Sequence, residues 1–282
     1  MDLKEARSLA AKEIGDGGIE RPWFEADLII SSLTGYDRSR LHASPRENLP
    51  EEIVPLFLEA VSRRKKREPL QYILGSCRFM DLTLAVGPGC LVPRPETELL
   101  VLESRKHFRG GVFLDWGTGS GCLAAAILQD DHESRCIAVE KEPRAIMWAW
   151  KNLKKAGLLG RCLLWHSGDP GMVPIPDPGF EMIVANPPYI SSGEISGLMP
   201  EVSLFEPSSA LDGGFDGLDF YRLLFPWSRG ALAPGGVLIL EIGDDRQALE
   251  IEKIYSHFFS VESLVRDLNG ISRILVLKKQ SF

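Results

Sequence analysis

Strand-like and helix-like patterns alternate along this chain from about residue 112 to its end. Short apolar runs are separated by longer stretches whose apolar residues recur at helical spacing. Such alternation predicts an α/β fold in which helices cover a mostly parallel sheet. The seven expected strands are 112–116, 135–139, 161–165, 180–185, 236–242, 257–265 and 272–278.

The first 75 residues follow a different pattern. Their apolar side chains recur at helical spacing, with glycines near the expected helix ends, which predicts a small helical bundle over residues 1–75. Residues 76–95 contain strand-like positions around a Gly-Pro-Gly turn signal, so a β-hairpin linker is expected there. The larger α/β domain then covers 96–282. No internal repeat or low-complexity segment is apparent.

A basic run, Arg63–Arg67, closes the N-terminal region. One interpretation is a solvated helix end, where cations interact favourably with the helix dipole. The other is a contact patch for an acidic partner surface, and the sequence leaves both open.

Composition excludes several classes of protein. The 282 residues carry a net charge of −7, which argues against non-specific binding of nucleic acid. The five cysteines are scattered and form no C-x-x-C pair, and the five histidines are dispersed, so neither a disulfide framework nor a metal site is expected. The N-terminus does not resemble a signal peptide, and no apolar run approaches the roughly 20 residues of a membrane helix. A cytoplasmic protein is the expectation.

A glycine-rich loop directly follows the first expected strand. It reads Gly117-Thr118-Gly119-Ser120-Gly121 and opens a helical pattern. Glycines in such a turn allow a ligand to approach backbone N–H groups. Glu140 ends the second strand 19 residues after Gly121, close to the roughly 20-residue spacing of an acid that binds ribose hydroxyls. Together these features predict a nucleoside-bearing cofactor across the first two strand ends.

The tetrad Asn186-Pro187-Pro188-Tyr189 follows the apolar run 182–185, at the expected carboxyl end of a strand. Two successive prolines donate no backbone hydrogen bonds and stiffen the turn, leaving carbonyl groups free to accept. The asparagine adds an acceptor and a donor, and the tyrosine adds an aromatic wall. The tetrad is therefore suited to binding a planar –NH2 group by its two hydrogens.

These two motifs resemble those of known enzymes. Leu114-Asp115-x-Gly117-x-Gly119-x-Gly121 is similar to motif I of class I methyltransferases that use S-adenosylmethionine. The tetrad resembles the [D/N]-P-P-[Y/F] motif of methyltransferases acting on amino or amide nitrogens. Further similarity to the HemK/PrmC family of release-factor glutamine N5-methyltransferases lies in Pro69–Gly75, Val92–Glu98, Phe205–Leu211 and Gly213–Tyr221.

The resemblance implies a class I methyltransferase (Rossmann-like) fold and an activity. The enzyme would transfer a methyl group from S-adenosylmethionine to the Gln of the Gly-Gly-Gln motif of peptide chain release factors, leaving S-adenosylhomocysteine. The helical bundle would hold the protein substrate, and a monomer is expected. The implied cofactor-binding residues are Gly117, Thr118, Gly119, Ser120, Gly121, Glu140, Asp169 and Asn186.

The expected chemistry at the tetrad is catalysis by positioning. Asn186 Oδ1 and the Pro187 carbonyl would each accept one N–H of the substrate amide, which aims its nitrogen at the sulfonium methyl. Pro188 and Tyr189 complete the substrate-binding set, with Tyr189 packed on the amide plane. Asn186, Pro187 and Tyr189 are the predicted catalytic residues.

Two alternatives remain at the level of sequence. A methyltransferase acting on exocyclic amino groups of DNA or RNA bases would use the same tetrad, but it must flip its base and hold phosphates with a basic face. The net negative charge lies entirely after residue 95, in the expected catalytic region. A non-catalytic protein on the same fold is the other alternative. The 93–98 loop either initiates a helix, or it closes over the cofactor or guides the substrate.

Overall fold

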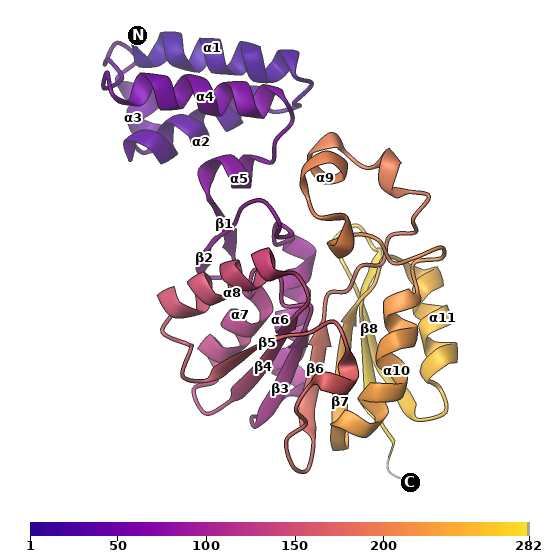
Figure 1. Cartoon of the computed structure of the whole chain (residues 1–282). Helices are drawn as coiled ribbons and strands as arrows, with labels where there is room; N and C mark the ends of the chain where they lie inside the picture. Colours follow the sequence, from indigo (N-terminus) through magenta and orange to yellow (C-terminus); the bar gives the residue numbers. More distant parts are fainter. Residues whose placement is uncertain (281–282) are drawn as a thin grey trace. The chain divides into compact units, whose positions relative to one another are not determined.

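The computed structural model describes residues 1–280 and divides the chain into two compact units. Unit 1 comprises Met1–Ser76 together with Met199–Phe205, and unit 2 comprises Cys77–Leu198 and the residues from Glu206 onward. The sequence-based division at residue 75 does not include the second segment of unit 1. Figure 1 shows the elements of both units.

Unit 1 is a helical bundle. Its helices are α1 (Leu3–Asp16), α2 (Pro22–Thr34), α3 (Arg38–Ala43), α4 (Ile53–Lys65), α5 (Leu70–Leu74) and α9 (Pro200–Phe205). Asp2 begins α1 with a reciprocal capping box with Glu5, and the Asp37 side chain caps α3. The core between α1, α2 and α4 contains fully buried Leu3, Ile29 and Phe57.

The basic run at the end of α4 is paired inside unit 1. Arg64 is only 5% exposed and binds Glu25, with Nε–Oε2 at 2.5 Å, and Glu201, with Nη2–Oε1 at 3.0 Å. Arg67 reaches Glu201 as well, at 2.6 Å. The interpretation as a solvated helix end is therefore wrong for Arg64. These ion pairs join the 199–205 segment to the end of α4 within unit 1.

Unit 2 begins with a two-stranded hairpin and continues as a seven-stranded sheet with helices. The hairpin strands are β1 (Ser76–Phe79) and β2 (Leu82–Ala85). The sheet strands are β3 (Val112–Trp116), β4 (Arg135–Glu140), β5 (Cys162–His166), β6 (Phe180–Ala185), β7 (Leu232–Glu241), β8 (Phe259–Arg266) and β9 (Ser272–Lys279). The helices are α6 (Glu98–His107), α7 (Cys122–Asp130), α8 (Pro143–Lys155), α10 (Asp219–Ala231) and α11 (Asp245–Tyr255), and the short 3₁₀ turns are η1 (Pro95–Thr97), η2 (Pro170–Met172), η3 (Ile195–Gly197) and η4 (Ser208–Ala210).

The strand order is β5-β4-β3-β6-β7-β9-β8, with β9 antiparallel to both of its neighbours and the other pairs parallel. This confirms the prediction of a mostly parallel sheet. The chain adds β4 and β5 on one side of β3 and then returns to place β6 on the other side. Open α/β sheets bind ligands at such a reversal, outside the carboxyl ends of the strands.

The strand register brings the two predicted motifs together. Trp116, the last residue of β3, pairs with Ala185, the last residue of β6. Gly117 and Asn186 therefore leave the sheet side by side. Trp116 also pairs with Val139, so the Glu140 carboxylate at the end of β4 lies on the other side of the glycine loop.

Alternate residues of the central strands point into two separate apolar cores. Phe113 and Met182 face the core beneath α6 and α7, whereas Leu114 and Ile183 face the core beneath α10 and α11. All four are fully buried, and each such side chain contributes about 1.5–3 kcal/mol to folding. Figure 1 shows the sheet between these helices. Within residues 1–280, no helix is long and apolar enough to cross a membrane.

Candidate active site

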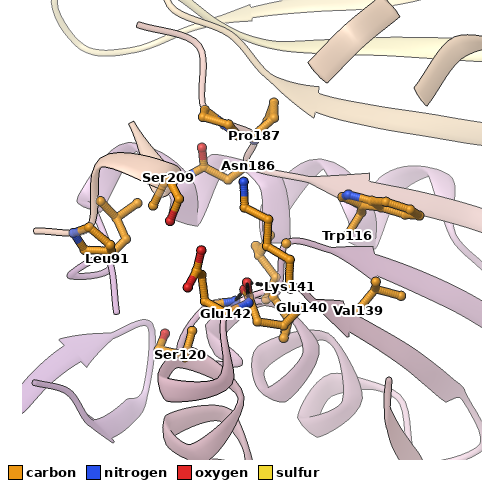
Figure 2. Close-up of a pocket in the computed structure, with 18 of the residues that line it drawn as sticks. Leu91, Trp116, Ser120, Val139, Glu140, Lys141, Glu142, Asn186, Pro187 and Ser209 are labelled. Atoms are coloured by element: carbon orange, nitrogen blue, oxygen red, sulfur yellow. Dashed lines mark hydrogen bonds between the residues drawn. The ribbon is translucent and has the colours of Figure 1, made fainter. Parts of the chain in front are cut away.

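A cavity opens in unit 2 at the carboxyl ends of β3, β4 and β6. Figure 2 shows Asn186 and Pro187 on one side of it and Glu140 and Ser120 on the other. The charged side chains that line it are Glu140, Lys141 and Glu142, so the lining carries no basic excess. Its walls come from residues within 89–97, 116–123, 139–145, 167–168, 186–188 and 207–223.

The glycine loop is shaped by backbone conformation. Gly117, Gly119 and Gly121 have φ of 73°, 56° and 78°, values that residues with a side chain rarely adopt. Several loop amides point into the protein, contrary to the expectation that they face a ligand. The N–H groups of Gly117 and Thr118 both donate to the Val139 carbonyl, at 2.9 Å each. The loop therefore allows a ligand to come close to the backbone, but most of its N–H groups are already hydrogen-bonded within the protein.

Glu140 is buried at the end of β4 and accepts three backbone hydrogen bonds. Its Oε1 accepts from the N–H groups of Lys141 and Glu142, at 2.8 and 2.9 Å. Its Oε2 accepts from the Gly119 N–H at 2.9 Å. This carboxylate is held rigidly at the cavity wall, and Oε2 retains an acceptor site for a ligand hydroxyl.

Asn186 and the first proline of the tetrad lie at the cavity wall, directly after β6. The Asn186 amide nitrogen, Nδ2, donates to the Thr97 hydroxyl at 2.9 Å. This leaves the amide oxygen, Oδ1, as the acceptor available to a substrate. Pro187 and Pro188 also line the cavity, and neither has an N–H that would compete for the carbonyl groups.

Behind the tetrad lies a buried acid. Glu241, 1% exposed at the end of β7, accepts from the Tyr189 hydroxyl at 3.4 Å. Burial raises the pKa of Glu241 to about 7, although Thr97 and Tyr189 act in the opposite direction through hydrogen bonds. The Tyr189 carbonyl accepts from Gln247 Nε2 at 2.7 Å. The tetrad is thus tied to β7 and α11 as well as to β6.

The 93–98 loop contributes to the cavity and also begins a helix. Pro93 and Thr97 line the cavity, while Pro95 opens the 3₁₀ turn that leads into α6. Arg94 forms an ion pair with the buried Glu206, and burial raises the pKa of that carboxyl. This pair joins the loop to the start of the 206–211 segment, part of which forms another wall.

Most predicted site residues line this cavity, but three do not. Gly117, Thr118, Gly119, Ser120, Glu140, Asn186, Pro187 and Pro188 line it. Gly121 instead begins α7, and exposed Asp169 accepts from the Gly171 N–H at 2.8 Å to open η2. Ser167 and Gly168, from the same connection, reach the cavity in place of Asp169. Tyr189 is half-buried, and its ring packs against the core beneath α10 and α11.

Sequence reasoning assigned no role to Thr97, Asn152 and Glu241. Asn152 on α8 accepts from the Ala85 N–H at 2.7 Å and donates to the Ser120 carbonyl at 2.8 Å, which joins β2 to the glycine loop. Glu241 carries a signal in the sequence, because it is an acid near the end of an apolar strand, much as Glu140 is. Over residues 1–280, no cluster of three His, Cys, Asp or Glu side chains is arranged to hold a metal ion.

The N-terminal helical region and the methyltransferase region of this chain both match known protein families. Residues 5–75 match the PrmC N-terminal domain, and residues 95–203 match the methyltransferase small domain. A release factor glutamine methyltransferase from Geobacter sulfurreducens is 37% identical over 263 residues, covering 93% of this chain and 91% of the relative. Its counterpart in Moorella thermoacetica is 39% identical and covers 87% of each chain. The chain belongs to the release factor glutamine methyltransferase family.

Solved structures agree with the fold of this family. A methyltransferase from Pyrococcus furiosus has a TM-score of 0.54 at 19% identity, covering 82% of this chain and all of that protein. The ribosomal protein L11 methylase of Lactobacillus delbrueckii gives a TM-score of 0.51 at 20% identity, covering 70% of this chain and 84% of that protein. This chain therefore has a Rossmann-like class I methyltransferase fold, which confirms the prediction from the sequence.

Proposed function

We propose that this chain transfers a methyl group from S-adenosylmethionine to the side-chain amide nitrogen, N5, of the glutamine in the Gly-Gly-Gln motif of peptide chain release factors. Full-length similarity to release factor glutamine methyltransferases carries this proposal, since it covers both units. The juxtaposition of the glycine loop and Asn186 at one cavity supports it independently.

The cavity suits the proposed cofactor. Glu140 is positioned to accept from the ribose hydroxyls, and the glycine loop lets the ligand approach the backbone. Trp116 lines the wall and is held by edge-to-face contact with Phe220. Bound S-adenosylmethionine supplies a methyl group on a positively charged sulfur, and the product is S-adenosylhomocysteine. Asp169 does not contact the cofactor in this proposal; it supports the cavity wall at Ser167 and Gly168 through backbone hydrogen bonds with the Ser167 hydroxyl.

Asn186 and Pro187 orient the substrate amide. An amide nitrogen is a poor nucleophile because its lone pair is delocalised into the carbonyl group. Asn186 Oδ1 and the Pro187 carbonyl each accept one N–H, so that the nitrogen faces the methyl carbon in line. Positive charge develops on that nitrogen as the bond forms, and fixed acceptors stabilise it more in the transition state than in the ground state. Neutral product forms when one of the two N–H protons leaves to solvent.

The remaining tetrad residues support this geometry. Pro188 lines the cavity beside the substrate position, and Tyr189 closes the wall behind it through its contacts with Glu241. Unit 1 would hold the release factor, with the 76–95 hairpin region as linker and the rest of unit 2 as the catalytic domain. We expect the enzyme to act as a monomer in the cytoplasm, where release factors function.

A methyl-transfer assay tests the proposal. The protein is incubated with radiolabelled S-adenosylmethionine and either release factor or nucleic acid, and label is counted in each. Label should enter the release factor. Asn186→Ala should abolish transfer while the cofactor affinity stays within about tenfold, whereas the same change at exposed Asn269 should have no effect. Unchanged turnover in Asn186→Ala would reject the role of that residue.

The same assay separates the alternatives. Label in nucleic acid alone would identify a base methyltransferase, although a cavity lining with one lysine and two glutamates does not favour a phosphate backbone. Label in neither substrate would indicate a non-catalytic protein.

A further inference from the structure

Thr97 occupies a position where threonine ordinarily caps a helix, but it does not cap. It is the residue before α6, and its side chain makes no capping hydrogen bond there. The side chain is 2% exposed and its hydroxyl accepts from Asn186 Nδ2 at 2.9 Å. A buried hydroxyl turned away from its local helix and toward a cavity residue suggests a role in the site.

Two partners decide how the Thr97 hydroxyl is oriented. Besides accepting from Asn186, it lies beside the Glu241 carboxyl and lowers the pKa of that group by hydrogen bonding. An ionised carboxylate can only accept, so it favours a Thr97 O–H that points toward Glu241. The Thr97 oxygen must then accept from Asn186, and only Nδ2 of that amide can donate.

Two tyrosine hydroxyls contact Glu241, one at its carboxyl group and one at its backbone. The Tyr189 hydroxyl donates to its Oε1, and the Tyr221 hydroxyl donates to its backbone carbonyl at 2.7 Å. Its buried Oε2 has no hydrogen-bond partner among residues 1–280. A buried carboxyl with so few partners is costly, which argues that the arrangement serves the site.

We infer that Thr97 and Glu241 are positioning residues that fix the Asn186 amide with Oδ1 toward the substrate glutamine. If the amide turned over, its NH2 group would meet the substrate NH2 group and neither could accept. Because the inference concerns how Asn186 meets a carboxamide, it rests on the proposed function.

The support depends on the ionisation of Glu241. Its pKa, about 7, reflects burial first and then its neighbours. When protonated, Glu241 can donate to Thr97, and the hydrogen bonds from Asn186 to Thr97 and from Thr97 to Glu241 no longer have a fixed direction. Activity should therefore fall as the pH drops through about 7. The charged or titratable groups around it are Glu96 on η1, Cys122 on α7, Tyr189 after β6, Tyr221 on α10 and Arg273 on β9.

Thr97→Val and Thr97→Ser form the decisive pair of variants. Valine keeps the shape and removes the hydroxyl, whereas serine keeps the hydroxyl and removes a methyl group. Thr97→Val should lower kcat/KM for release factor about 10- to 100-fold, since a donor is left unpaired, and Thr97→Ser should stay within about threefold. Affinity for S-adenosylhomocysteine, measured by calorimetry, should change less than about threefold in both.

Glu241→Gln provides a second test if Thr97→Val does not fold. The wild-type kcat/KM should show an acid limb near pH 7, and Glu241→Gln should lose that limb and be about tenfold less active at pH 8. Full activity in Thr97→Val, equal losses in the serine and valine variants, or an unchanged acid limb in Glu241→Gln would overturn the inference. Absence of transfer by the wild-type chain would instead refute the proposed function.

Discussion

Replacing Glu140 by glutamine tests the cofactor side of the site. Glutamine has the same shape but no charge, and one of its two terminal atoms is a donor. In the native protein both carboxylate oxygens face backbone N–H groups, from Gly119 on one side and from Lys141 and Glu142 on the other. Whichever way the new amide turns, its NH2 group meets at least one of these donors.

The expected magnitude follows from these contacts. A hydrogen bond between a charged group and a hydroxyl contributes about 1.5–3 kcal/mol. Losing the bond from Glu140 to the ribose should weaken cofactor binding about 10- to 150-fold. The unliganded protein should also lose about 1–3 kcal/mol of unfolding free energy, because the glycine loop is held by the same carboxylate.

Isothermal titration calorimetry with S-adenosylhomocysteine measures this affinity without turnover. It is done at a temperature where both proteins are folded, as judged by circular dichroism. Glu133→Gln is the matched control, since this exposed residue lies before the opposite end of β4. If Glu140→Gln bound the ligand within about twofold of the wild type, the assignment of Glu140 to the ribose would be wrong.

Two further predictions concern stability. Burial raises the pKa of Asp115 to about 7, so its stabilising contribution is complete below about pH 4 and is lost as the pH rises through about 7. The free energy of unfolding, measured with urea, should fall between pH 4 and 8 by about 4 kcal/mol more in the wild type than in Asp115→Asn. The same dependence on pH in both proteins would contradict this. Arg64→Ala should leave Glu25 unpaired and Glu201 with Arg67 as its remaining partner, and should cost unit 1 about 3–5 kcal/mol of unfolding free energy. Arg63→Ala, which breaks a more exposed pair with Glu68, should cost about 1 kcal/mol or less, and equal losses in the two variants would show that burial of Arg64 is unimportant.

The sheet could be predicted from the sequence because its strands are short apolar runs. The strands 112–116 and 180–185 were predicted with their observed bounds. The strand expected at 236–242 instead begins at Leu232, before Gly235 and Gly236, which indicate a turn in the sequence. The strand continues through these glycines, and its register against β6 is irregular there. This continuation depends on pairing with β6, which the local sequence does not reveal.

The site could be predicted only in part. The glycine loop, Glu140 and the tetrad are local patterns next to strand ends, so the sequence reveals them. Thr97 meets Asn186 across 89 positions of sequence, and that contact depends on the packing of α6 against β7, the neighbour of β6. The charge pairing of Arg64 with Glu201 is equally non-local, and a run of basic residues cannot reveal its partners.

Mass spectrometry of the methylated substrate tests the central claim most directly. Release factor is incubated with the enzyme and S-adenosylmethionine, digested, and its peptides are fragmented to locate the added methyl group. One methyl group is expected on the side-chain amide nitrogen of the glutamine in Gly-Gly-Gln, and none with Asn186→Ala. A methyl group on another residue, or on the same glutamine with Asn186→Ala, would contradict it.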